Sequence, residues 1–98
     1  MEANIKAIHF DISDNLTAFV NKKIEKLLRR YEAIDGVDVN LRLIKPETAM
    51  NKEAGVKLIV PGSPDLFASK TADTFEEAFD LALEALEKPL EKTKDKAK

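Results

Sequence analysis

The residues of this chain that could do chemistry are basic side chains gathered at helical spacing. Five of them fall within one short stretch: Lys22, Lys23, Lys26, Arg29 and Arg30. On an α-helix, at about 100° per residue, they share an arc about 120° wide. Cations on a rigid surface bind phosphate groups without reading base sequence. The stretch therefore predicts a phosphate-binding face, and the alternative is a solvated face in which Glu25 supports Arg29 at i,i+4.

A second basic segment lies near the end of the chain. Its candidate phosphate-binding residues are Lys88, Lys92 and Lys94. Acidic residues crowd the start of the same segment and lysines its end, which is the order that a helix dipole favours. An ordinary surface helix is therefore the alternative here too.

The sequence contains little that could catalyse a reaction. It has one histidine, His9, and no cysteine, and it has no glycine-rich phosphate loop. We predict a structural or exposed role for His9, no enzymatic activity, no cofactor and no metal site. Phe19, Tyr31 and Phe67 could stack on bases, although core packing is the commoner role for such residues.

Composition sets the broad class. At 98 residues the chain is expected to be one domain, 1–98. The net charge of −2 and the pI of about 5.4 mean that any nucleic-acid binding must use a local patch. The acidic balance also keeps open a protein-interaction domain without a nucleic-acid role. Without a signal sequence or a membrane-length apolar run, we predict a cytoplasmic protein with no membrane partner.

Periodicity predicts six elements. Strands are expected at 4–10, 37–43, 56–60 and 66–72, because apolar residues alternate there with polar ones. In the first strand, Ile8, Phe10 and Ile12 are the expected core-facing residues, with a bend or bulge because Ile5 lies in the opposite phase. Residues 46–53 are expected to form a polar loop.

Helices are expected at 14–32, capped by Ser13, and from Thr74 onward, where Thr74 and Glu77 form a capping box. Pro89 cannot donate a backbone hydrogen bond, so the second helix should kink or end near Lys88. Residues 89–98 would then form a flexible basic tail.

The predicted fold is α+β, a two-layer sandwich in the order β-α-β-β-β-α with two helices on one face of a four-stranded sheet. Three successive strands joined by short turns pair most simply as an antiparallel meander. Helices side by side would bring their outer surfaces together. We therefore expect the basic arcs of the two helices to join into one patch.

Three stretches together resemble a known family. They are ISDNLTAFVNKKIEKL at 12–27, the meander at 37–70, and FEEAFDLALEALEKPLEKTKDK at 75–96. The chain resembles the ribosome hibernation promoting factors, also called ribosome-associated inhibitors or ribosomal subunit interface proteins, in their short form. The resemblance implies translational inhibition under stress, by occupation of the messenger- and transfer-RNA channel of the small ribosomal subunit. It implies the whole ribosome and its ribosomal RNA as partners, and no small-molecule substrate.

The resemblance also implies which side chains bind RNA. The family's basic positions fall on Lys23, Lys26, Lys88, Lys92 and Lys94, and the helical arc adds Lys22, Arg29 and Arg30. The chain departs from the family's pattern at Ala85 and Glu91, where basic residues are common, and at Pro89, where glutamine is usual. A general double-stranded-RNA-binding module, with much of the same topology, is the alternative from the same chemistry.

Overall fold

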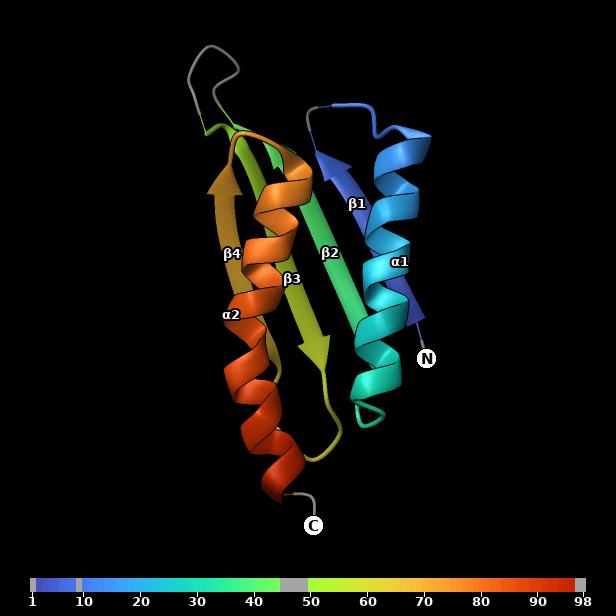
Figure 1. The fold of residues 1–98 in the computed structure, drawn as a ribbon, viewed down its shortest axis with the longest axis vertical. Coiled ribbons are helices and arrows are strands. Elements are labelled where there is room, and N and C mark those ends of the chain that lie inside the picture. The colour runs from blue at the N-terminus through green and yellow to red at the C-terminus, as the bar shows by residue number, and fades with distance from the viewer. Residues whose placement is uncertain (1, 9, 45–49, 97–98) are drawn as a thin grey trace.

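The structure, a computed structural model, describes residues 2–8, 10–44 and 50–96, and the side chains of these except residues 2 and 93–96. The described elements follow the predicted order β-α-β-β-β-α (Figure 1). Their bounds are β1 (Glu2–Ile8), α1 (Asp14–Arg30), β2 (Gly36–Leu43), β3 (Lys52–Ile59), β4 (Leu66–Ala72) and α2 (Phe75–Lys96).

The strands form one sheet in the order β1-β2-β3-β4. The β1 strand pairs parallel to β2, and β2, β3 and β4 pair antiparallel in turn, which confirms the predicted meander. The register aligns Ile5 with Val39 and Val39 with Val56. Apolar residues of successive strands therefore stand on the same face of the sheet.

Both helices cover that face (Figure 1), with α1 over β1 and β2 and α2 over β3 and β4. The core lies between the two layers, which confirms the predicted two-layer sandwich. Helix α1 contributes Leu16, Val20, Ile24 and Leu27, and α2 contributes Phe75, Ala78, Phe79, Ala82, Leu86 and Leu90. Within the part of the chain that the structure describes, the opposite face of the sheet carries no helix (Figure 1).

The first strand differs from its prediction. Ile5 packs against the core, whereas Ile8 lines the open face of the sheet. The chain bends at Phe10, and Phe10 and Ile12 then pack against the core outside the strand. The bend changes which side chains face the core. The prediction that Ile8, Phe10 and Ile12 all face the core is therefore correct for Phe10 and Ile12 but wrong for Ile8. His9 lies outside the described residues.

The connection before β3 is also shorter than predicted. β3 begins at Lys52, within the predicted loop, and residues 46–49 of that loop lie outside the described residues. Ala54 and Val56 of this strand are fully buried, which explains why the strand starts early.

The helix starts are capped as the sequence predicts. The Ser13 hydroxyl accepts a hydrogen bond from the Leu16 backbone N–H at 3.1 Å, and the Thr74 hydroxyl accepts one from the Glu77 N–H at 3.1 Å. These bonds satisfy N–H groups that have no partner within the helix.

Of the two outcomes predicted near Lys88, a kink or the end of the helix, the structure excludes the end. The helix does not end near Lys88 but continues through Pro89 to Lys96. Leu90 lies one turn after Leu86 and is 2% exposed, so the apolar stripe continues beyond the proline. Burial of Leu90 offsets the backbone hydrogen bond that Pro89 cannot donate. The predicted tail is therefore helical as far as Lys96, and residues 97–98 lie outside the described residues.

Candidate nucleic-acid interface

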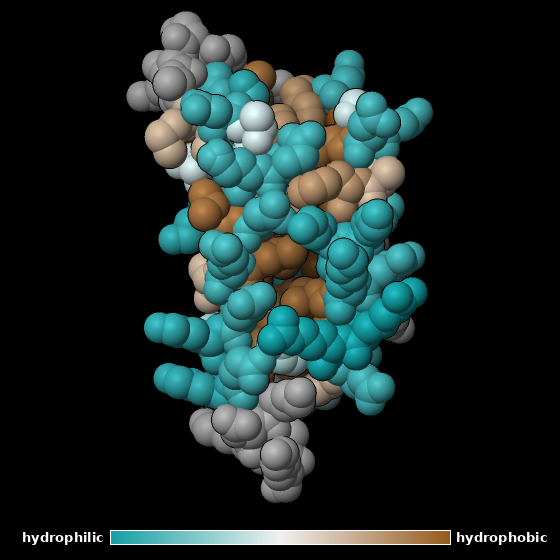
Figure 2. Space-filling view, viewed as in Figure 1, coloured by the Kyte–Doolittle hydropathy of each residue, from teal (hydrophilic) through white to brown (hydrophobic). Residues whose placement is uncertain are grey.

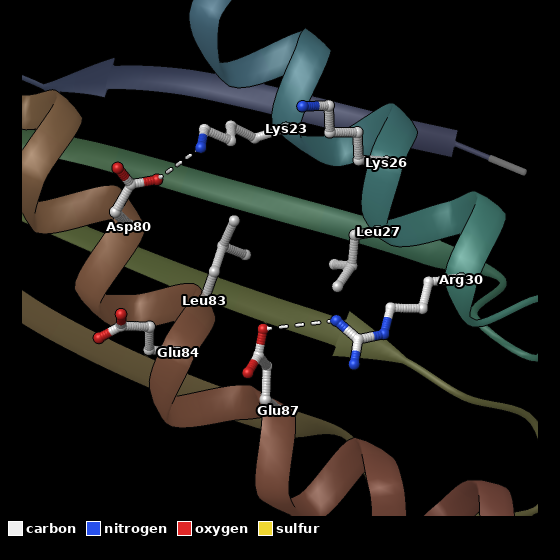
Figure 3. Close-up of a pocket in the computed structure, with 8 residues that line it drawn as sticks. All are labelled: Lys23, Lys26, Leu27, Arg30, Asp80, Leu83, Glu84 and Glu87. Atoms are coloured by element: carbon white, nitrogen blue, oxygen red, sulfur yellow. Dashed lines mark ion pairs between the residues drawn. The ribbon is translucent and has the colours of Figure 1, made fainter.

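The basic arc of α1 is divided between two flanks of the helix. One flank faces solvent, and we call it the outer flank: Lys22 and Arg29, with Lys26 at its border, where Lys26 also lines the groove between the two helices (Figure 3). All three residues are exposed, and they form no ion pair with any residue that the structure describes. Their charges are therefore available to an external anion.

The other flank faces α2 across a groove. Lys23 Nζ lies 3.5 Å from Asp80 Oδ1, and Arg30 lies 3.9 Å from Glu87 Oε1 and 3.7 Å from Glu91 Oε1. Figure 3 shows Lys23 and Arg30 reaching across to carboxylates of α2. Since each of these side chains is 39–61% exposed, each pair contributes only about 0–1 kcal/mol to stability.

The opposing carboxylates come from successive turns of α2. They follow one another at intervals of four, three and four residues, which places them along one side of a helix. We call them the acidic row: Asp80, Glu84, Glu87 and Glu91. Leu27 and Leu83 line the groove between the two helices, and Figure 2 shows apolar surface there between polar side chains. Apolar packing between the helices thus sets which charges face each other.

Lys88 and Lys92 of α2 are exposed but lie on a different side of the helix. At about 100° per residue, the acidic row occupies the sector of α2 between these lysines and α1. The expectation that the two basic arcs join into one patch is therefore wrong, because carboxylates separate them. Lys94 lies within α2, and its side chain is outside the described part of the chain.

Two of the aromatic candidates for base stacking already make contacts within the protein. The Phe19 ring packs edge-on against Phe79 at 6.4 Å, and the Lys23 ammonium lies 5.5 Å from its centre. Tyr31 is buried, and its hydroxyl donates a hydrogen bond to Glu91 Oε1. Burial, and then this bond to Glu91, raises the pKa of the Tyr31 hydroxyl above its usual 10.

The third candidate, Phe67, is 63% exposed but stands on the open face of the sheet, away from both helices. Its ring lies over Gly55, where a Cβ atom would come within 3.4 Å of the ring. Two nearby cations are paired, since Arg42 lies 2.7 Å from Glu53 and Lys57 lies 3.4 Å from Asp65, and Lys6 lines the same open face. Phe67 therefore does not extend the basic surface of α1.

Sequence reasoning missed the acidic row as a partner of the basic arc. Its spacing was visible in the sequence, but the direction in which it points depends on how the helices pack. The described residues contain no group of three or more His, Cys, Asp or Glu side chains that could hold a metal ion. Neither helix, over its described length, is apolar enough to cross a lipid bilayer.

Comparison with known proteins identifies the family of the chain. A family model described as sigma 54 modulation protein / S30EA ribosomal protein matches residues 3–98. No curated protein matches the chain by sequence.

Several solved structures share the fold. A ribosomal subunit interface protein from Coxiella burnetii has 23% sequence identity and a TM-score of 0.83, covering 97% of this chain and 99% of that chain. The N-terminal domain of Protein Y from Thermus thermophilus has 21% identity and a TM-score of 0.77, covering 95% and 99% respectively. At these identities the likeness establishes the fold.

Proposed function

Because the chain belongs to the sigma 54 modulation protein / S30EA ribosomal protein family, we propose that it binds ribosomes in the cytoplasm and inhibits translation. The proposed binding site is the messenger- and transfer-RNA channel of the small subunit. The contacts would run from basic side chains of its helices to ribosomal RNA. The fold shared with the ribosomal subunit interface protein of Coxiella burnetii is consistent with this proposal.

The observation that carries the proposal is the outer flank of α1. Lys22, Lys26 and Arg29 stand on a helix that is anchored to the sheet by a fully apolar inner stripe. Such a surface can follow a phosphate backbone by shape and charge, which is how proteins recognise folded RNA. Lys88 and Lys92 would provide a separate contact from α2, with Lys94 one half-turn further along.

Lys23 and Arg30 have a different part in this proposal. Each already faces a carboxylate of α2, so each must leave that carboxylate to contact a phosphate. They should therefore contribute less to binding than Lys22 and Arg29, which have the same charges on the same helix.

Sedimentation with ribosomes and separated subunits tests the proposal over a series of salt concentrations. Binding to the small subunit or the whole ribosome should weaken with salt, because phosphate contacts release counterions. The double variant Lys22→Gln/Arg29→Gln should bind at least about tenfold more weakly, since a bond to a charged group contributes about 1.5 kcal/mol. The matched variant Lys23→Gln/Arg30→Gln should lose less than about threefold by the same free-energy conversion.

Other outcomes point to the alternatives. Equal binding to ribosomes and to a free RNA duplex would favour a general double-stranded-RNA-binding module. No association with ribosomes, even at low salt, would contradict the proposal and favour a protein-interaction domain. Circular dichroism of each variant confirms that lost binding is not lost folding.

A further inference from the structure

The acidic row lies where the proposed RNA surface would otherwise be continuous. Asp80, Glu87 and Glu91 each lie within 4 Å of a basic side chain of α1. The cations that they face, Lys23 and Arg30, belong to the same arc as the outer flank. Three carboxylates of the protein thus lie beside two cations that could otherwise contact RNA phosphates.

We infer that the acidic row determines how RNA can approach α1. It competes with phosphates for Lys23 and Arg30, and it repels any backbone that enters the groove between the helices. RNA would be restricted to the outer flank, and the row would limit affinity for polyanions in general. This inference rests on the proposed RNA binding by α1 and adds the residues that set its orientation and strength.

The geometry favours competition over a structural role. All members of the three ion pairs are substantially exposed, and their N–O distances of 3.5–3.9 Å exceed those of strong charge-assisted hydrogen bonds. Exposed pairs of this kind add little to stability, so a phosphate can replace a carboxylate without unfolding the protein. The negative charges of the acidic row are then the main obstacle to a second row of phosphate contacts.

The glutamine and asparagine isosteres test this inference. The groove variant is Asp80→Asn/Glu87→Gln/Glu91→Gln, which keeps side-chain shape and retains an amide oxygen for the Tyr31 hydroxyl. We expect it to bind ribosomes about tenfold more tightly than the natural protein, equivalent to about 1.4 kcal/mol. Two added phosphate contacts should also steepen the slope of log affinity against log salt by about 1.5.

A matched control separates local competition from net charge. The variant Asp38→Asn/Glu53→Gln/Asp65→Asn also removes three negative charges, but beside the open face of the sheet. It also frees two ion-paired cations, Arg42 and Lys57. We expect its ribosome affinity to change less than about threefold by the same conversion.

Heparin chromatography provides a readout that does not depend on the ribosome. The groove variant should elute at higher salt than both the natural protein and the control variant. If the two triple variants elute together and bind ribosomes equally, the row acts only through net charge and the inference is wrong. Weaker binding by the groove variant would also overturn it.

The ribosome proposal and this inference can be refuted independently of each other. If the natural protein and both variants do not sediment with ribosomes, that proposal is contradicted. The order of elution from heparin would still decide whether the acidic row controls access to the cations of α1.

Discussion

Replacing Tyr31 with phenylalanine tests the contact that joins the end of α1 to α2. The Tyr31 ring is 4% exposed, and phenylalanine keeps that apolar burial. What is lost is the hydrogen bond from the hydroxyl to Glu91, which also lies 3.7 Å from Arg30. The substitution therefore removes a polar bond between the helices.

The size of the effect follows from the exposure of the acceptor. Bonds to charged groups contribute about 1.5–3 kcal/mol when the abandoned partner stays buried. The Glu91 side chain is 49% exposed, so water replaces the lost donor. We expect the free energy of unfolding to fall by about 1 kcal/mol, which corresponds to about 4–8 °C in Tm for a domain of this size.

The raised pKa of Tyr31 makes the free energy of unfolding depend on pH. The unfolded chain ionises this hydroxyl near pH 10, whereas burial and the bond to Glu91 hold the proton in the folded state. Stabilisation by Tyr31 is therefore complete below about pH 10 and is lost as the pH rises through the higher folded pKa. The stability difference between the natural protein and Tyr31→Phe should narrow over that interval.

The assay is urea denaturation followed by circular dichroism, together with a titration of tyrosinate absorbance. Tyr31 is the only tyrosine and the chain has no tryptophan, so the absorbance reports one site. A stability of Tyr31→Phe equal to that of the natural protein would refute the reasoning. A titration midpoint at or below the ordinary tyrosine pKa would refute it independently.

The remaining predictions concern the core and α2. Leu86→Ala should lower the free energy of unfolding by about 2–5 kcal/mol, because the side chain is 1% exposed and its removal leaves a cavity. The matched substitution Leu81→Ala, at a position 37% exposed, should cost less than about 1 kcal/mol, and equal costs would contradict the assigned core. Pro89→Ala should raise the free energy of unfolding by about 1–3 kcal/mol, because alanine restores a backbone donor inside α2. Urea midpoints measure all three, and a destabilised Pro89→Ala would mean that the ring's packing outweighs the missing bond.

Much of the fold was predictable because its signals are local. The alternation at 37–43 defined β2 and its buried Val37, Val39 and Leu41, and β4 spans the predicted 66–72. The serine and threonine caps began both helices where expected. In each case the information lies within a few residues, since side-chain period and capping are properties of neighbours in sequence.

The sequence also determined which residues could bind phosphate, but tertiary structure decided which of them remain available. All five basic residues of α1 share one arc, yet Lys23 and Arg30 face carboxylates while Lys22 and Arg29 do not. Likewise, α2 continues past Pro89 because Leu90 is buried in the core. Helical periodicity orders side chains around one helix, but only packing against the sheet and the other helix sets where each side points.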